Sequence, residues 1–464
     1  MIKFTFRVLI SALLITFSWV VPSFGTDHKT FNINDYGSNG DGKTLNTGAF
    51  QKAIDDCSQN GGGTVLVPKG TFITGTIFLK SNITLFLEEG AVIKGTRDLT
   101  KYSPFNPKDN EEPGLNWFRA LILGVNIENV TITGKGTIDG DHVFDAEGEE
   151  KMRGPHAILF GDSKNITLTD ITIRNAANYA FLGWRIEKAT FKNLVFNAGW
   201  DGIHVRWGKD ISVTHCKFYT GDDCIAGGEW ENTLIADNSI NSSCNGIRLI
   251  MPAKNLEIRD CKIYGPGKFE HRTYKEKMRR NTLCAIVLQP GSWGSAPGAM
   301  ENILVKNITI ENIENAVSLV LNEENTATGI VFDHIKATNI KSSACVIESW
   351  KGSTFGDVTF RNIQFEYAES DNPEIAASEI SKPGVDPRPL PCWALFACKV
   401  NTLTLENIKL TFKGNEMRPA FIFENIKQLN LKNVRFPEVK NVKPVLLKNV
   451  EKLNVVNVRP ALQL

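Results

Sequence analysis

Neither sign of charge is in surplus in this sequence, which holds 52 Lys and Arg against 51 Asp and Glu. It therefore lacks the basic face that nucleic-acid binding requires, and no nucleic-acid partner is expected. The cysteines form no Cys-x-x-Cys pair and no zinc-type Cys/His spacing, so no structural zinc is predicted. After residue 25 no apolar run is long enough to span a membrane, and no linker rich in Ser, Pro or Gly divides the chain. These absences favour one soluble domain without membrane spans, metal or cofactor.

Residues 1–25 have the composition of a secretory signal peptide. Lys3 and Arg7 are followed by an apolar run and then by small residues up to Gly25. We expect this segment to be removed and the remaining chain, residues 26–464, to be secreted or periplasmic. A retained N-terminal anchor is the alternative interpretation.

The nine cysteines are an odd number, so an exported chain keeps at least one free thiol. Cys392 with Cys398, and Cys224 with Cys244, are candidate disulfides. Spacing does not decide either pairing, because disulfide geometry depends on the distance between the two Cα atoms.

A short pattern of alternating apolar and polar residues recurs along the chain, as in "NITLTDITIRN" from residue 165 and "NLEIRDCKIYG" from residue 255. Alternation with a period of two predicts β-strands. One apolar position per repeat advances in steps of 23, 22, 22 and 23 residues, at Leu168, Phe191, Val213, Ile235 and Ile258. Propeller blades need about 40–50 residues per repeat, so this spacing indicates a solenoid. We predict an all-β fold, a single-stranded right-handed parallel β-helix.

The segments outside the repeat have predictable places in such a solenoid. A short amphipathic helix at residues 49–57 is expected to cap the open N-terminal end of the apolar column. Excursions at 101–118, 265–283 and 366–392 are expected to leave one face as loops, commonly the binding face. Asparagines recur at the bends, where stacked amides bond along the column and Asn tolerates left-handed turns.

Acidic residues occupy one position in consecutive coils. Asp201, Asp223 and Asn245 each follow the apolar position of their repeat by ten residues. Because neighbouring strands lie about 4.7–4.9 Å apart, these side chains are expected to form a line, with Asp222 beside it. Such crowding raises at least one pKa, and glycosidic cleavage uses one protonated and one ionised carboxyl group. A turn-capping cluster and a metal site are the alternatives.

Further polar residues are expected beside the aspartates, because they alternate with inward-facing Ile and Val. Arg248 is a candidate for binding an anionic group of a substrate, and an ion pair with Asp222 or Asp223 is the alternative. His204 is interpreted either as a proton-transfer or binding residue or as a hydrogen-bonded surface histidine. Trp200 is a candidate sugar-stacking platform, against plain loop packing.

The opening "FNINDYGSNGDGKTLNTGAFQKAIDDC", together with "GTIDG", "WDGIHV" and "GDDCIAG", resembles glycoside hydrolase family 28, the polygalacturonases and related pectin-degrading enzymes. The resemblance covers about residues 30–460. It implies a pectin-lyase-like solenoid and an inverting hydrolysis of a polysaccharide. It also implies that Asp222 is the general acid, and that Asp201 and Asp223 hold and activate the water.

The chain departs from the family at three motifs. The family's Asn-Thr-Asp is "GWD" here, and its Gly-His-Gly is "CNG", which lacks the histidine thought to tune the acid. Its Arg-Ile-Lys, which grips the galacturonate carboxylate, aligns with Val287 and Gln289 at the basic positions. Either Arg248 takes over that grip, or the substrate is rhamnogalacturonan-like, decorated or neutral. The expected substrate-binding residues are Asn245, Arg248, His204, Gln289 and Trp200.

Three functions remain in competition after the sequence alone. The first is a secreted, inverting glycosidase acting on a pectic, uronic-acid-containing polysaccharide. The second is a lyase of the same fold, with Arg248 as the base near a calcium ion. The third is a non-catalytic carbohydrate-binding or adhesin module. Each has a polysaccharide or oligosaccharide as its partner, and a monomer is expected. The basic excursion at 265–283, which carries His271, either walls off one end of the cleft or is a solvated loop.

Overall fold

The computed structural model describes residues 29–105, 119–272, 278–322, 324–341, 344–350, 352–368 and 372–462. The expected signal peptide lies outside these residues, as do parts of all three excursions, at 106–118, 273–277 and 369–371. No helix within the described segments is long and apolar enough to cross a membrane.

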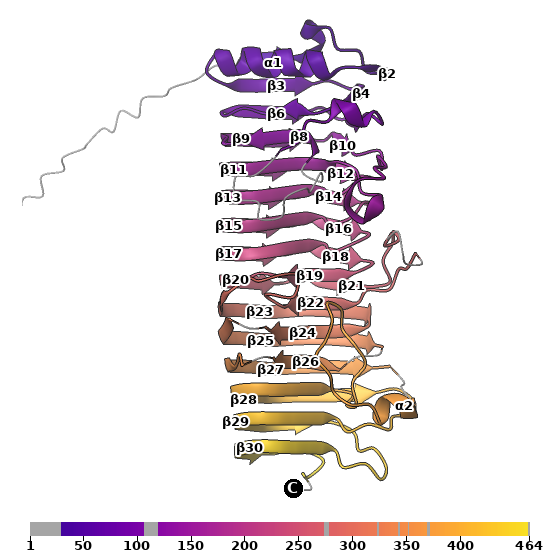
Figure 1. Cartoon of the computed structure of the whole chain (residues 1–464), viewed down its shortest axis with the longest axis vertical. Helices are drawn as coiled ribbons and strands as arrows, with labels where there is room; N and C mark the ends of the chain where they lie inside the picture. Colours follow the sequence, from indigo (N-terminus) through magenta and orange to yellow (C-terminus); the bar gives the residue numbers. More distant parts are fainter. Residues whose placement is uncertain are drawn as a thin grey trace, which may run out of the picture.

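The described chain winds into a tall column of parallel strands, with each coil resting on the one before it (Figure 1). The predicted right-handed parallel β-helix is confirmed. The strands pair in three vertical stacks around one apolar interior, and the longer strands bend across the corner between two stacks.

The strands fall into these stacks, here named A, B and C, by their pairings. Stack A contains β1 (Thr30–Asn32), β3 (Gly63–Val67), β6 (Ile83–Leu87), β9 (Glu128–Gly134) and β20 (Ala253–Arg259). Stack B contains β2 (Asp41–Leu45), β4 (Gly70–Thr74), β7 (Ala91–Gly95), β10 (Thr137–Asp139), β12 (Thr172–Arg174), β14 (Val195–Asn197), β16 (Lys217–Thr220), β18 (Ser239–Ser242) and β21 (Lys262–Tyr264). Stack C contains β5 (Ile77–Phe78), β8 (Ala120–Val125), β19 (Asn245–Leu249), β22 (Cys284–Leu288), β24 (Asn315–Leu321) and β26 (Cys345–Ser349).

The remaining strands run through more than one stack. Those passing from C into A are β11 (His156–Thr169), β13 (Phe181–Lys192), β15 (Ile203–Thr214), β17 (Ile225–Ala236) and β30 (Val445–Val456). Those passing from A into B are β23 (Gly298–Ile313), β25 (Asn325–Ile340) and β27 (Phe355–Tyr367). β28 (Leu395–Phe412) and β29 (Phe421–Arg435) begin in C and continue through A.

The register predicted from the repeat is confirmed residue by residue. Leu168 pairs with Phe191, Phe191 with Val213, Val213 with Ile235, and Ile235 with Ile258. All five side chains are buried in the interior column. The alternating apolar pattern therefore fixes which side of each strand faces inward.

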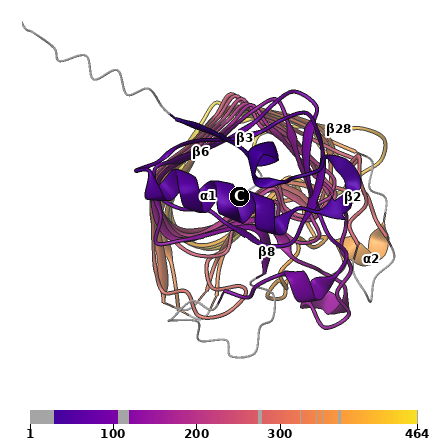
Figure 2. The same ribbon diagram turned by 90° about the horizontal axis from the view of Figure 1, so that it is seen from above.

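The N-terminal end of the column is covered by α1 (Thr47–Gln59), which confirms the predicted cap (Figures 1 and 2). Its apolar face buries Phe50, Ala53, Ile54 and Cys57 against the first coils. Outside the column, α2 (Pro373–Ala376) lies in the excursion before β28, and the 3-10 turns are η1 (Ile33–Tyr36), η2 (Leu99–Lys101) and η3 (Glu149–Lys151).

Asparagine ladders form at the bends, as predicted. Asn165 Nδ2 donates to Asn129 Oδ1 at 2.9 Å, and Asn129 Nδ2 donates to Asn82 Oδ1 at 2.8 Å. All three residues have positive φ angles, between 55° and 62°, which Asn adopts more readily than other non-glycine residues.

Both candidate disulfides are wrong, because all nine cysteines are free thiols. Cys224 belongs to the apolar interior, whereas Cys244 Sγ lies near the carboxylate of Asp222 and outside that core. Cys392 is fully buried, while Cys398 is partly exposed.

Candidate active site

Asp201, Asp223 and Asn245 stack at the turn that leads into stack C, as the repeat predicts. The backbone oxygen of each residue accepts a hydrogen bond from the preceding coil: Ala180 N donates to Asp201, Gly202 N to Asp223, and Cys224 N to Asn245. The side chains continue the ladder, since Asp201 Oδ1 accepts from Asp223 N at 3.2 Å and Asp223 Oδ1 from Asn245 N at 3.1 Å.

Glycine is required where this turn packs closely. A Cβ atom on Gly202 would lie 2.5 Å from the backbone oxygen of Cys224. The Gly that follows Asp201 therefore allows successive turns to approach closely enough for the aspartates to stack.

The three aspartates form one buried cluster. An oxygen of Asp201, one of Asp222 and one of Asp223 all lie within 4.8 Å of one another. The three residues are 4%, 9% and 6% exposed, respectively. Three carboxylates this close cannot all be ionised at low cost, so the cluster retains protons more readily than isolated aspartates.

Asp201 is held by a neutral histidine. His204 Nδ1 donates to Asp201 Oδ2 at 2.8 Å, while His204 Nε2 accepts from Arg206 Nε at 3.4 Å. The imidazole stacks on the ring of Tyr179, with 4.6 Å between ring centroids. Burial and the charge of Arg206 lower the pKa of His204 well below its ordinary value. Burial, followed by Asp222 and Asp223, raises the pKa of Asp201 well above its ordinary value.

Replacing Asp201 with Asn is expected to change how stability depends on pH. The raised pKa of Asp201 means that the folded state binds a proton there more tightly than the unfolded chain. Its stabilising contribution is therefore complete below the unfolded pKa of about 4 and is lost as pH rises through the folded pKa. Melting temperatures of wild type and Asp201→Asn at pH 4.5 and 7.5 test this. The melting temperature of the variant relative to that of wild type should be higher at pH 7.5 than at pH 4.5.

The matched control for this prediction is Asp333→Asn. Asp333 has a lowered pKa, so its contribution should be constant across that range and lost only in acid. If the difference in melting temperature between Asp201→Asn and wild type is as independent of pH as that of Asp333→Asn, a raised pKa at Asp201 is contradicted.

Asp222 is paired with a buried arginine that the sequence motifs did not indicate. Arg153 Nη2 donates to Asp222 Oδ2 at 2.8 Å, and Arg153 Nε donates to Glu150 Oε2 at 3.1 Å. The guanidinium lies 3.9 Å from the centroid of the Trp200 ring, a cation–π contact. Burial alone would raise the pKa of Asp222, but Arg153, His271 and Arg248 outweigh it and lower the pKa to about 2.

Asp223 is bound by the two predicted residues that follow it on the next coil. Asn245 Nδ2 donates to Asp223 Oδ1 at 2.8 Å, and Arg248 Nη1 lies 3.7 Å from Asp223 Oδ2. Burial raises the pKa of Asp223 although Arg248 opposes it, and Asp222 adds to the rise. Of the two interpretations of Arg248, the ion pair with Asp223 is therefore formed.

Arg248 and Gln289 lie together, but both donate to the protein itself. Arg248 Nη2 donates to the backbone oxygen of Val385 at 2.7 Å, and Gln289 Nε2 donates to the same atom at 3.2 Å. Val385 belongs to the excursion before β28, which therefore lies against this side of the site. The indole of Trp293 lies 5.2 Å from the guanidinium of Arg248.

Comparison with known proteins shows which proteins this chain is similar to. The family model "Rhamnogalacturonase A/epimerase, pectate lyase-like" matches residues 30–248. A probable polygalacturonase of Vitis vinifera is 29% identical over 255 residues, which cover 50% of this chain and 48% of that protein. An exopolygalacturonase of Platanus acerifolia is 24% identical over 390 residues, which cover 78% of this chain and 96% of that protein.

A solved structure extends the likeness at the level of the fold. The hyperthermoactive exopolygalacturonase from Thermotoga maritima has a TM-score of 0.54 to this chain at 18% identity, covering 87% of this chain and 92% of the other. The chain is therefore similar to polygalacturonases, as expected of a protein that resembles glycoside hydrolase family 28. The resemblance expected from "GTIDG", "WDGIHV" and "GDDCIAG" is confirmed.

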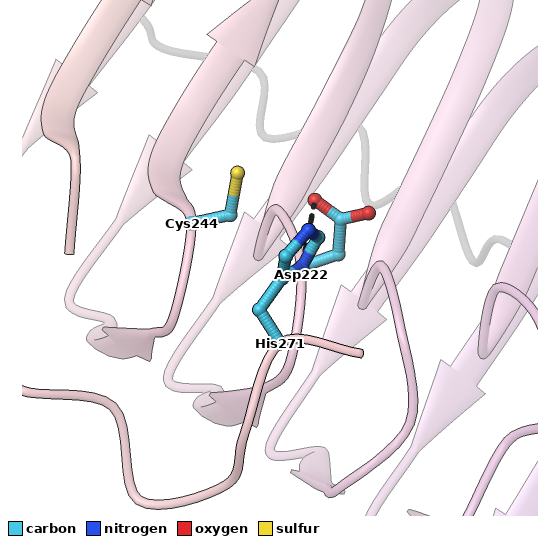
Figure 3. Close-up of side chains that lie close together, drawn as sticks. All are labelled: Asp222, Cys244 and His271. Atoms are coloured by element: carbon cyan, nitrogen blue, oxygen red, sulfur yellow. Dashed lines mark ion pairs between the residues drawn. The ribbon is translucent and has the colours of Figure 1, made fainter. Parts of the chain in front are cut away.

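A second side-chain cluster lies next to the aspartates and shares Asp222 with them (Figure 3). Asp222, Cys244 and His271 each place a polar or sulfur atom within 4.8 Å of the others. His271 comes from the 265–283 excursion, and its Nδ1 lies 3.9 Å from Asp222 Oδ1. At His271 the excursion is not a solvated loop, because this side chain is buried against the site.

Both clusters have the residue types that hold metal ions, but their surroundings are cationic. Arg153 donates to Asp222, and Arg279 Nη2 donates to Cys244 Sγ at 3.7 Å. His271 Nδ1 carries its hydrogen toward the backbone oxygen of Gly221, at 3.0 Å. A metal ion would have to displace these donors, since ligands bind metals in their deprotonated form.

A cavity of about 380 Å³ lies beside Trp200 in this polygalacturonase-like protein. Its walls come from the turn after β10, from the turn before Asp201 and from the 265–283 excursion. They include His142, Phe144, Met152, Trp200, Arg272 and Arg280. Trp200 lines this cavity and also contacts the guanidinium of Arg153, which pairs with Asp222.

Proposed function

We propose that the protein is a secreted or periplasmic glycoside hydrolase that cleaves a pectic, uronic-acid-containing polysaccharide with inversion. The observation that carries this proposal is the buried cluster of Asp201, Asp222 and Asp223 on stacked turns. Carboxyl groups with divergent pKa values are what acid and base catalysis of glycosidic cleavage requires. The similarity to polygalacturonases and to the rhamnogalacturonase A/epimerase family supports a pectic substrate. The protein is proposed to act as a monomer.

The family resemblance assigns the general acid to Asp222, and the water-activating pair to Asp201 and Asp223. In the free site the pKa of Asp222 is low and that of Asp201 is high. We propose that Asp201 and Asp223, whose pKa values are both raised, hold a proton of the cluster before substrate binds, and that Asp222 receives it before donating it to the glycosidic oxygen. Asp201, once deprotonated, then joins Asp223 in drawing a proton from the attacking water. The inverting outcome rests on the family resemblance.

The neighbouring residues support these roles by fixing the carboxyl groups. His204 orients Asp201 through Nδ1, and Asn245 orients Asp223 through Nδ2. Trp200 holds the guanidinium of Arg153 against Asp222. Because Arg248 and Gln289 donate to Val385, they are proposed to hold that segment beside Asp223 and to contact substrate only through their remaining donors.

A panel of polysaccharides tests the proposal. Wild-type protein is incubated with homogalacturonan, rhamnogalacturonan, xylogalacturonan and a neutral glucan, and new reducing ends and product lengths are measured. Release from at least one pectic polymer, and none from the glucan, is expected. No release from any pectic polymer, with retained binding, would instead support the carbohydrate-binding alternative.

Removing metal ions is expected to leave this activity unchanged. A hydrolysis carried by carboxyl groups needs no cation, whereas the lyase alternative needs a calcium ion held by carboxylates such as these three. The assay is repeated in a chelator, with absorbance in the ultraviolet recorded for unsaturated products. Loss of activity with chelator, or a rise in that absorbance, would replace the hydrolase with the lyase.

A further inference from the structure

The described parts of the 265–283 excursion, residues 265–272 and 278–283, are docked onto the turn that carries Cys244. Ser243 Oγ donates to the backbone oxygen of Phe269, and Thr282 Oγ1 donates to that of Ser242 at 2.6 Å. Arg279 Nη1 donates to the backbone oxygen of Ser243 at 3.0 Å. His271 and Arg279 form a backbone bridge across the described ends of the excursion. These contacts hold His271 in one place.

The receiving surface is shaped for this close approach. A Cβ atom on Gly221, the residue directly before Asp222, would lie 2.6 Å from the backbone oxygen of Glu270. The same Cβ atom would lie 2.5 Å from the backbone oxygen of Gly199, so a glycine at position 221 allows the close approach of both the neighbouring coil and the excursion. The sequence "GDD" therefore serves two purposes. Its two aspartates belong to the carboxyl cluster, and its Gly leaves room for the segment that brings His271 to Asp222.

His271 and Arg153 approach different oxygens of the same carboxyl group. Arg153 Nη2 donates to Asp222 Oδ2 at 2.8 Å, and His271 Nδ1 lies 3.9 Å from Asp222 Oδ1 (Figure 3). The edge of the His271 ring meets the ring of Trp200, with 5.8 Å between centroids, and Trp200 also covers Arg153. Arg153, Trp200 and His271 thus form one continuous wall around Asp222.

We propose that His271 is a positioning residue for Asp222, so that the segment 265–272, which carries it, is a working part of the active site. This inference rests on the proposed function, because it gives Asp222 a defined orientation toward the glycosidic oxygen. His271 Nδ1–H donates to the backbone oxygen of Gly221 at 3.0 Å, and this anchor keeps Nδ1 at 3.9 Å from Asp222 Oδ1. Arg153 fixes the Oδ2 side.

The charged and titratable groups that face His271 come from four segments. Asp222 lies on the turn before β17, and Cys244 lies on the turn before β19. Arg153, from the segment before β11, reaches His271 through Asp222 and Trp200. Arg279 of the excursion itself donates to Cys244. His271 is among the groups that lower the pKa of Asp222, after Arg153.

Two substitutions of His271 separate position from charge. His271→Ala should lower kcat by about 10- to 100-fold with KM changed less than about twofold, because a misplaced catalytic group loses rate and not affinity. His271→Asn places an amide nitrogen where Nδ1 was and should recover most of that loss. Both variants lack a group that lowers the pKa of Asp222, so the limb of the pH profile that reports Asp222 should move upward by about 1 unit in both.

Lys268→Ala is the matched control from the same excursion. Lys268 is exposed and its ammonium group lies over the ring of Tyr219, away from the aspartates. It should show wild-type kcat, KM and pH profile. If His271→Ala behaves like Lys268→Ala while wild type hydrolyses a pectic substrate, the positioning role is refuted and the proposed function stands.

A titration without turnover separates the two proposals. Protein with 13C-labelled aspartate carboxyl groups is titrated, and the Asp222 signal is assigned by its loss in Asp222→Asn. The titration midpoint of the Asp222 signal should be higher in His271→Asn than in wild type, and this result does not depend on which substrate the protein hydrolyses. An unchanged midpoint overturns the inference about His271. A raised midpoint in a protein that hydrolyses no pectic polymer contradicts only the proposed function.

Discussion

Replacing Asp222 with Asn is expected to reduce kcat for pectic hydrolysis by about 10²- to 10⁴-fold, the contribution typical of a general acid. Asn has the size of Asp and can still accept from Arg153 Nη2, so the turn that leads into stack C should remain folded. The variant should also keep its affinity for oligosaccharides. The measurement is the rate of reducing-end release, together with binding of the same oligosaccharide and a melting curve.

Asp139→Asn is the control for that substitution. Asp139 is another buried aspartate with its own arginine, since Arg174 Nε donates to it at 2.8 Å, and it lies outside the catalytic cluster. It should keep the wild-type rate even where it lowers the melting temperature. Wild-type turnover in Asp222→Asn would remove Asp222 from the chemistry.

Replacing Arg153 with Ala is expected to cost about 3–5 kcal/mol of unfolding free energy, because it leaves buried acids without their cation. Asp222, Glu149 and Glu150 all face Arg153, and its guanidinium also covers Trp200. The pKa of Asp222 should rise, since burial would no longer be outweighed. Urea unfolding curves at pH 7 measure the loss, and it should shrink in acid as these carboxyl groups become protonated.

The comparison variant is Arg361→Ala. Arg361 makes a half-exposed ion pair with Asp333 at 2.9 Å, away from the catalytic turns, and such pairs contribute about 0–1 kcal/mol. Arg153→Lys keeps the charge but loses the flat contact with Trp200, so it should fall between wild type and Arg153→Ala. A cost for Arg153→Ala as small as that for Arg361→Ala would mean that the ion pair with Asp222 is not formed in solution.

The repeat in the sequence was sufficient to predict the column and the alignment of the aspartates. One apolar position per coil fixes the register, and every residue at a constant offset from it is then stacked, including Asp201, Asp223 and Asn245. The same logic placed His204 and Arg248 on one vertical line, which the pairing through Ala226 confirms. Wherever the repeat continues, the place of a residue in one coil predicts the places of the residues at the same offset in the other coils.

The residues that sequence reasoning missed come from segments outside the repeat. Arg153 lies between β10 and β11, and His271 lies in the 265–283 excursion, where no offset from a repeat position applies. Their places depend on contacts such as the stacking of Arg153 on Trp200 and the packing of Glu270 against Gly221. The "CNG" motif signalled a missing histidine, but only the fold could show that His271 lies next to Cys244.

The most direct test follows the first products of wild-type hydrolysis by proton NMR, on whichever pectic fragment the panel identifies. The account predicts that the new reducing end appears first with inverted anomeric configuration, without unsaturated sugar, and that Asp222→Asn shows no such signal over the same time. Products of retained configuration, an unsaturated product, or the same signal from the variant would contradict it.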